Sequence, residues 1–145
     1  MPESRASAVW EGELVSGSGR VGVQSGAFPE LPVTWAARTQ RPNPKTSPEE
    51  LLAAAHAACY AMAFAHTLAT AGHAPDHLAV EAVCQFTPVE SGFAVSAMDV
   101  DAHGRVPGID QAAFAGWARE AEQGCPISNA IRGNVAISLT ATLDA

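Results

Sequence analysis

The chain has 145 residues, of which 8 are Lys or Arg and 15 are Asp or Glu, and its formal net charge is −7. This length suits one domain, which buries roughly two-thirds of the surface that its unfolded chain exposes. The negative charge repels phosphate backbones and anionic lipids, so it argues against nucleic acid and membrane surfaces as partners. The N-terminus has no apolar stretch that could serve as a signal peptide, so we expect a cytoplasmic protein.

The first forty residues favour β-strands. Apolar and polar residues alternate over 7–14 and again from residue 21 to 26, and the intervening "SGSGR" is typical of a turn, so we expect a hairpin. A third strand is predicted over 31–38, "LPVTWAAR". The two prolines of residues 39–46 then indicate a loop.

A long apolar helix is predicted over 48–72. Ser47 is a good N-cap, Pro48 suits the first helical position, and Glu50 completes a capping box with Ser47. The stretch is long enough to span a membrane. Its apolarity rests mostly on alanine, however, it contains two histidines, and no basic cluster flanks it, so a buried helix of a globular protein is the better interpretation.

The rest of the chain gives a second hairpin, a second helix and a closing strand. The hairpin turns at "ESG", and "VPGID" breaks the chain before Asp110, which can cap the second helix. The resulting order, βββ-α-ββ-α-β, favours a single α+β domain over residues 1–145 rather than a doubly wound parallel sheet. The expected elements are strands over 77–89 and 92–102, a helix over 111–123 ended by Gly124, a turn or short helix over 125–133, and a strand over 134–143.

The first long helix is unusual because alanine occurs on nearly every side of it. From Leu51 to Ala65 the only strongly polar side chain is His56. A helix that covers one sheet in a small monomer should be polar on its other side. We therefore expect this helix to form a dimer core, and the alternative is an alanine-rich face exposed to solvent.

The three cysteines occupy different contexts. Cys59 lies in the middle of the long helix, and Cys125 lies at a chain reversal where free backbone N–H groups can stabilise a thiolate. Cys84 alternates within a strand and is expected to be a buried structural thiol. An odd number of cysteines in a reducing compartment is not a disulfide framework, so each is a core residue, a ligand or a reactive group.

The histidines give only weak support to a metal site or a hydrolase. His56 and Cys59 are three residues apart on one helix, but Pro75 prevents a helix from presenting His73 and His77 together. The chain has no CxxC or HExxH motif, so no bound metal is expected. A hydrolase would need His56 as a base for Cys59, and a packing role for that histidine is the simpler reading.

Three segments resemble signatures of the OsmC/Ohr family of thiol peroxidases: "TSPEELLAAAHAACYAMA", "VPGID" and "GCPISNAIRGNV". The order of strands and helices resembles that family along nearly the whole chain. The combination of the helix motif with the CPxSN turn is specific, whereas either alone would be weak. The resemblance implies an intertwined homodimer in which sheets enclose the central helices.

The resemblance also implies a reaction, the reduction of organic hydroperoxides by a cysteine on the central helix. That cysteine matches Cys59, which would become a sulfenic acid as the peroxide is reduced to an alcohol. Cys125 matches the family's resolving cysteine and would form a disulfide with Cys59. A dithiol, in this family a lipoyl type, would then reduce the disulfide, and no bound metal or organic cofactor is implied.

A thiol with a pKa of about 8.5 is mostly protonated at pH 7, so this reaction needs a nearby cation. The resemblance implies an arginine held by a glutamate, and Glu49 matches the glutamate. "VTWAAR" resembles the OsmC-type segment that ends in the arginine, which favours Arg38, while Arg20 is the candidate by resemblance to the Ohr branch. "WEG" and "VPGID" resemble the OsmC branch.

An apolar pocket near Cys59 would favour organic peroxides over hydrogen peroxide, because apolar burial contributes about 25 cal/mol per Å². Candidate lining residues are Trp35, Met62, Phe64 and Ile127, for each of which core packing is the alternative role. The rival function is a non-catalytic module that binds a hydrophobic ligand in the same pocket.

Helix geometry separates Glu49 from Cys59. Ten residues at a rise of 1.5 Å place them about 15 Å apart along one helix axis, so they cannot share a site within one straight helix. In a dimer with antiparallel central helices, Glu49 of one chain would reach Cys59 of the other. Small alanine side chains would permit that close approach.

Overall fold

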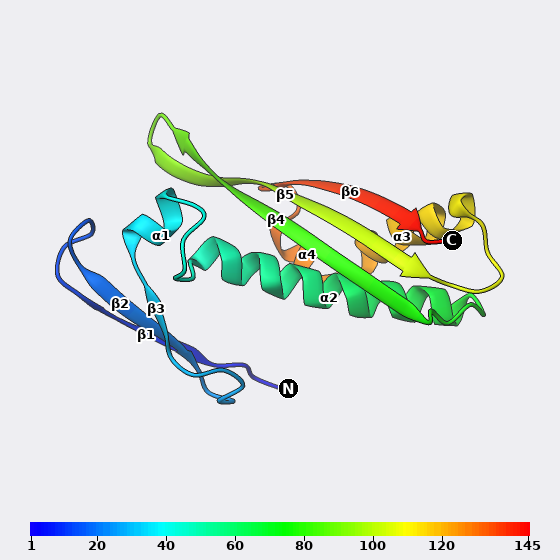
Figure 1. The fold of residues 1–145 in the computed structure, drawn as a ribbon, viewed down its shortest axis with the longest axis horizontal. Helices are drawn as coiled ribbons and strands as arrows, with labels where there is room; N and C mark the ends of the chain where they lie inside the picture. Colours follow the sequence, from blue (N-terminus) through cyan, green and yellow to red (C-terminus); the bar gives the residue numbers. More distant parts are fainter. The chain divides into compact units, whose positions relative to one another are not determined.

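The computed structural model describes residues 1–145, which divide into two compact units, Met1–Leu51 and Leu52–Ala145 (Figure 1). Helix α2 (Pro48–Thr70) is continuous through the boundary between the units. The assignment of the whole chain to one domain stays a prediction.

The first unit contains a three-stranded antiparallel sheet in the order β1-β2-β3. Strands β1 (Ala6–Glu11) and β2 (Ser18–Val23) form the predicted hairpin. The prediction of a third strand over 31–38 is wrong beyond Val33: β3 spans Leu31–Val33, and helix α1 (Trp35–Thr39) follows. The Thr34 hydroxyl causes this change, because it accepts a hydrogen bond from the Ala37 N–H and so caps α1.

Helix α2 begins at Pro48 as predicted, with Ser47 as its N-cap. The Glu50 N–H donates to Ser47 Oγ at 3.1 Å. The prediction is wrong for the second bond of the capping box, in which the Glu50 carboxylate would accept from the Ser47 N–H. The Glu50 carboxylate instead binds the Thr46 hydroxyl at 2.8 Å and Arg41 Nη2 at 2.6 Å. The helix ends at Thr70, two residues before the predicted end at Gly72, which has a φ of +89°.

The second unit contains a mixed sheet in the order β4-β5-β6. Antiparallel β4 (His77–Val89) and β5 (Gly92–Arg105) form the second predicted hairpin, and β6 (Ala136–Leu143) runs parallel to β5. Asp110 caps α3 (Gln111–Gly124) as expected, accepting from the Ala113 N–H at 2.9 Å. The short helix α4 (Pro126–Ile131) follows at once. These elements confirm the predicted α+β class.

One ridge of α2 packs into the core of this second unit. Its members recur every four residues and are fully buried: His56, Tyr60, Phe64 and Leu68. The Phe64 ring lies 4.8 Å from that of Phe114 on α3, and the Tyr60 hydroxyl donates to the Ala118 carbonyl at 2.8 Å. By length and composition alone α2 could cross a membrane. A helix that buries one ridge in a protein core, however, is the arrangement expected of a core helix rather than a membrane span.

The opposite ridge of α2 is exposed. Ala54, Ala58, Met62 and His66 follow the same four-residue spacing, and Met62 is 69% exposed. In the first unit all six residues of β1 are exposed as well. Apolar surface of this kind on a helix and a sheet is typical of a face that another chain covers.

Candidate active site

Two free thiols meet in the second unit. Cys59 is half-buried in the middle of α2, and Cys125 is fully buried between α3 and α4. The Cys125 thiol donates a hydrogen bond to Cys59 Sγ at 3.4 Å. The structure therefore brings together the two cysteines that the sequence singled out. Cys84 on β4 is half-buried and packs against the core, opposite Met98 on β5.

The backbone after Cys125 also contacts Cys59. Burial raises the pKa of the Cys59 thiol above its ordinary value, a hydrogen bond from the Ile127 N–H lowers it, and the adjacent Cys125 thiol raises it again. A backbone N–H of this chain reversal therefore affects the ionisation of Cys59. Because the pKa is raised on balance, Cys59 needs a cation from elsewhere to ionise at neutral pH.

The first unit holds the candidate cation. Arg38 Nε donates to Glu49 Oε1 at 3.1 Å, and Arg38 Nη2 donates to the same oxygen at 2.5 Å. The Glu49 side chain is only 7% exposed, so this is a shielded ion pair. The Trp35 ring lies against the guanidinium, with its centroid 5.7 Å from Arg38 Cζ.

Arg20, the alternative arginine, has a different environment. It lies on the exposed hairpin, 3.5 Å from Glu11 and 3.8 Å from Glu30, with half of its side chain accessible to solvent. Of the two arginines, only Arg38 contacts Glu49.

A pocket of about 380 Å³ opens beside Cys59 within the second unit. Met62 lines it as expected, whereas Phe64 is wrong as a lining residue because it is fully buried in the core. Ile127 and Trp35 are not among the lining residues either, and Trp35 lies on Arg38 in the first unit. The lining is mainly small or apolar, with two polar residues that sequence reasoning missed, and comprises Cys59, Met62, Ala63, His66, Thr67, Ala121, Gly124 and Pro126.

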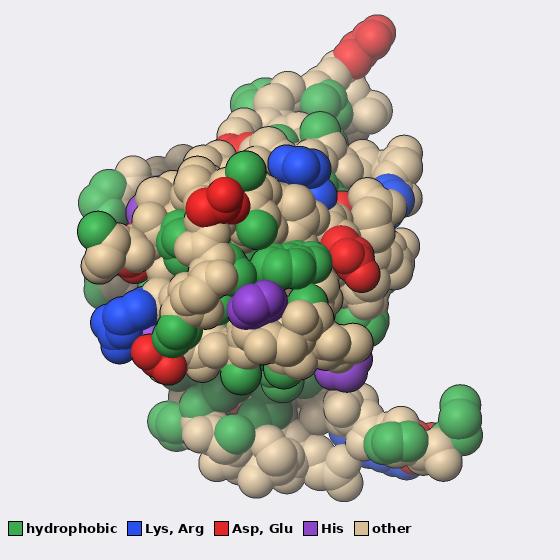
Figure 2. All heavy atoms as spheres, turned by 90° about the vertical axis from the view of Figure 1, so that its right-hand side faces the viewer, with side chains coloured by type: hydrophobic (Ala, Val, Ile, Leu, Met, Phe, Trp, Pro, Cys, Tyr) green, Lys and Arg blue, Asp and Glu red, His purple; other side chains and the backbone are tan.

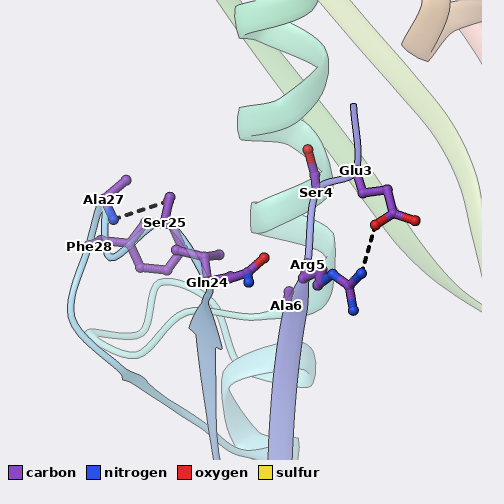
Figure 3. Close-up of a pocket in the computed structure, with 9 residues that line it drawn as sticks. Glu3, Ser4, Arg5, Ala6, Gln24, Ser25, Ala27 and Phe28 are labelled. Carbon is purple, nitrogen blue, oxygen red and sulfur yellow. Dashed lines mark hydrogen bonds and ion pairs between the residues drawn. The ribbon is translucent and has the colours of Figure 1, made fainter. Parts of the chain in front are cut away.

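A second hollow, of about 480 Å³, lies in the first unit between the start of β1 and the turn after β2 (Figure 3). An ion pair of 2.6 Å between Arg5 and Glu3 lies at its rim, and the Ala27 N–H donates to Ser25 Oγ at 3.2 Å (Figure 3). None of the expected site residues lines it. On the face drawn in Figure 2, acidic, basic and histidine side chains are scattered and form no large patch of one charge.

Sequence reasoning missed a buried polar network behind the thiols. His56 Nε2 lies 2.7 Å from Ser128 Oγ, and both residues are fully buried. Nearby, Arg132 Nη1 forms an ion pair of 2.9 Å with the Glu122 carboxylate. Burial lowers the pKa of His56, the negative charge of Glu122 raises it, and Arg132 lowers it. No local signal in the sequence predicts this contact, because His56 and Ser128 are 72 residues apart.

Comparison with known proteins agrees with this picture. Residues 41–140 match the family of OsmC-like proteins. The chain is 34% identical to peroxiredoxin OsmC of Escherichia coli (strain K12) over 133 residues, which is 92% of each chain. It is 33% identical to an organic hydroperoxide resistance protein of Xanthomonas axonopodis pv. citri over 96 residues, or 66% of each.

Solved structures show the same fold. An organic hydroperoxide resistance protein from Elizabethkingia anophelis superposes with a TM-score of 0.75 and 26% identity, covering 97% of this chain and 96% of that one. A protein of the same description from Legionella pneumophila gives a TM-score of 0.73 and 26% identity, covering 95% and 96%.

Proposed function

Because the chain belongs to the OsmC family, we propose that it is a thiol-dependent peroxidase that reduces organic hydroperoxides to alcohols through Cys59 and Cys125. The names of its relatives, peroxiredoxin and organic hydroperoxide resistance protein, support a redox role that involves hydroperoxides. The observation that carries the proposal is the contact of 3.4 Å between the two sulfur atoms, one half-buried beside a pocket and the other fully buried behind it.

The proposed cycle has two oxidative steps. The Cys59 thiolate attacks one peroxide oxygen, the O–O bond breaks, and the alcohol leaves while Cys59 becomes a sulfenic acid. The Cys125 sulfur then attacks Cys59 Sγ, an S–S bond forms, and the sulfenic oxygen departs as water with the thiol proton. One hydroperoxide and two thiols thereby give an alcohol, water and a disulfide.

We assign activation of Cys59 to Arg38, with Glu49 holding the guanidinium in place. The raised pKa of Cys59 supports this assignment, because a thiol shifted in that direction by burial needs a cation to ionise near pH 7. The two hydrogen bonds from Arg38 to Glu49 support it too, because a guanidinium that is already paired keeps a fixed orientation.

The second copy of the chain completes the site in this proposal. α2 is one continuous helix, so Glu49 lies about 15 Å from Cys59 of the same chain along its axis. We therefore propose a homodimer with antiparallel central helices, in which the Arg38–Glu49 pair of one chain serves Cys59 of the other. The exposed ridge of Ala54, Ala58 and Met62 supports close helix contact.

Reduction of the disulfide requires a dithiol, which we propose to be a lipoyl-type thiol in the cytoplasm. The reductant's first thiolate attacks one sulfur of the disulfide and forms a mixed disulfide, and its second thiol then displaces the enzyme sulfur. Cys59 is the accessible target because it lines the pocket, whereas Cys125 is fully buried.

A coupled assay tests the function directly. Purified protein is mixed with cumene hydroperoxide and dihydrolipoamide, and loss of peroxide is followed against a sample that lacks protein. Catalytic turnover is expected. The alternative, a binding module for a hydrophobic ligand, predicts that peroxide is not consumed and that the pocket binds apolar molecules equally well after both cysteines are replaced by serine.

A further inference from the structure

Helix α2 and the segment around Cys125 are joined at two points, one helical turn apart. Cys59 Sγ contacts Cys125 Sγ at 3.4 Å, and His56 Nε2 contacts Ser128 Oγ at 2.7 Å. Each contact links α2 to the same short stretch of chain, residues 125–128. The polar contact is fully buried, so solvent does not compete for it.

The stretch that carries Cys125 depends on such contacts for its position. α4 has six residues, begins with Pro126 and has no side-chain N-cap bond. Helices this short do not form on their own in water. Beyond α4, Arg132 Nη2 donates to the Glu122 carbonyl at 3.1 Å, which links the segment to the end of α3. The His56–Ser128 hydrogen bond links it to α2.

The geometry of His56 is not that of a simple packing residue. Its Nδ1 is buried and has no hydrogen-bond partner. A neutral imidazole has one N–H, so either Nε2–H donates to Ser128 or the Ser128 hydroxyl donates to Nε2. In both cases one buried polar atom stays unpaired, a cost that an apolar side chain of similar size would avoid. What the imidazole supplies in return is a directional contact with α4.

Building on the proposed function, we propose that His56 and Ser128 are positioning residues for the second oxidative step. They hold the Cys125 sulfur at attack distance while Cys59 is a sulfenic acid. In this step the S–S bond forms, the S–O bond of Cys59 breaks, and water leaves with the Cys125 proton. Reacting atoms that are held about 3–3.5 Å apart react far faster than freely diffusing ones, and the sulfur atoms lie within that range.

A misplaced Cys125 would leave the sulfenic acid exposed for longer. Excess hydroperoxide then has time to convert it to a sulfinic acid, which the dithiol cannot reduce. The Ile127 N–H that contacts Cys59 lies on the same short helix, so the first step is expected to slow as well, by a smaller factor.

The test separates the two steps in single turnover. Reduced protein is mixed with one equivalent of cumene hydroperoxide. Loss of peroxide reports the first step, and loss of Cys125 thiol together with trapping of the sulfenic acid by dimedone reports the second. For Ser128→Ala we expect disulfide formation to slow by about tenfold or more relative to the first step. Ser128→Thr keeps a hydroxyl and should restore the rate of disulfide formation.

Tyr60→Phe is the matched control. It removes an equally buried hydrogen bond of α2, the one to Ala118 on α3, and should lower stability while leaving the ratio of the two rates unchanged. A second pair of variants keeps the test informative if Ser128→Ala misfolds. The side-chain amide of His56→Gln reaches as far as Nε2 of the histidine, whereas that of His56→Asn is one bond shorter. Faster disulfide formation in the Gln variant supports the proposal.

If the wild-type protein consumes peroxide, either of two results would overturn this inference and leave the proposed function intact. One is disulfide formation at the wild-type rate in folded Ser128→Ala, and the other is an equal slowing of both steps. Equal rates in the two His56 variants would count against it in the same way. If wild-type protein consumes no hydroperoxide, the proposed function fails and the inference fails with it.

Discussion

The sulfur atoms of Cys59 and Cys125 lie 3.4 Å apart, yet the two residues differ sharply in accessibility, because Cys59 is half-buried and Cys125 is fully buried. An incoming hydroperoxide or thiol therefore meets Cys59 first. This asymmetry supports the different roles that we propose for two chemically identical side chains.

The first prediction concerns those roles. Cys59→Ser should abolish turnover, because it removes the nucleophile. Cys125→Ser should still consume about one equivalent of peroxide and stop with Cys59 as a sulfenic acid. Peroxide consumed per protein, with dimedone trapping and mass spectrometry, measures both outcomes.

Cys84→Ser is the control for that experiment, since Cys84 packs on β4 opposite Met98. Its activity should stay close to that of the wild type. An equal loss of single turnover in the Cys59 and Cys125 variants would contradict the assignment of nucleophile and resolving thiol.

The second prediction concerns the shielded ion pair. If Arg38 stabilises the Cys59 thiolate, Arg38→Ala should raise the pH midpoint for alkylation of Cys59 by iodoacetamide. Each unit of that rise lowers the thiolate fraction at pH 7 about tenfold, so kcat/KM should fall by about 10- to 100-fold. Glu49→Gln, which keeps an acceptor for Arg38, should give a smaller shift in the same direction.

Arg20→Ala is the matched control, because it removes an exposed arginine whose acidic neighbours are 3.5 and 3.8 Å away. Exposed pairs of this kind contribute about 0–1 kcal/mol to stability. The alkylation midpoint should not move. A shift in Arg20→Ala and none in Arg38→Ala would transfer the role to the hairpin arginine.

The third prediction concerns pH and stability. Burial lowers the pKa of His56 in the folded protein. As pH falls, His56 is therefore protonated in the unfolded chain at a higher pH than in the folded protein. The folded state is therefore most stable above the ordinary histidine pKa of about 6.5 and loses stability as pH falls below it, until the folded His56 also protonates. Glu122 moderates this loss and Arg132 adds to it.

Denaturant unfolding of wild type and His56→Gln at several pH values between about 5 and 7.5 measures this effect. The wild type should lose more stability than the variant, by up to about 1.4 kcal/mol for each pH unit over which only the unfolded chain is protonated. Parallel pH profiles for the two proteins would contradict the account of a buried neutral imidazole.

The sequence predicted the features that local signals encode. Ser47 and Asp110 each sit directly before a helix and cap it, and both hairpins follow from alternation and turn residues. The predictions that failed involve competition between local signals or contacts between residues far apart in the sequence. Thr34 acts as a helix cap within a segment that also has strand propensity, and Glu50 leaves the capping box for Arg41 and Thr46.

The His56–Ser128 hydrogen bond was beyond sequence reasoning for a different reason. Its members are 72 residues apart, and nothing in the local pattern of either segment specifies the other. The parallel pairing of β5 with β6 is similar, because α3 and α4 separate the two strands in the sequence. Such contacts follow from the tertiary fold rather than from periodicity.

The fourth prediction concerns the substrate. The pocket beside Cys59 is lined by Met62, Ala63 and other small or apolar groups. Burial of a peroxide's alkyl group there should stabilise binding by about 25 cal/mol per Å². Cumene or tert-butyl hydroperoxide should therefore have a clearly higher kcat/KM than hydrogen peroxide. Met62→Glu should narrow that difference. Equal kcat/KM values for all three peroxides in the wild type would refute an apolar substrate site.

The last prediction tests whether the site is shared between two chains. Since α2 is continuous from Pro48 to Thr70, Glu49 and Cys59 of one chain are separated by about 15 Å along its axis. In the proposed antiparallel dimer, Cys59 of each chain uses Glu49 of the other. A Cys59→Ser chain and a Glu49→Ala chain should each form homodimers of low activity.

A heterodimer of those two chains contains one intact site and one doubly defective site, so it should recover about half of the wild-type activity. Two different affinity tags allow the heterodimer to be isolated, and native mass spectrometry verifies its composition. Cys59→Ser paired with wild type serves as the reference for a dimer with one working cysteine. If the verified heterodimer stays as inactive as its parent homodimers, Glu49 does not act on Cys59 across an interface, and each Cys59 must instead depend on groups of its own chain.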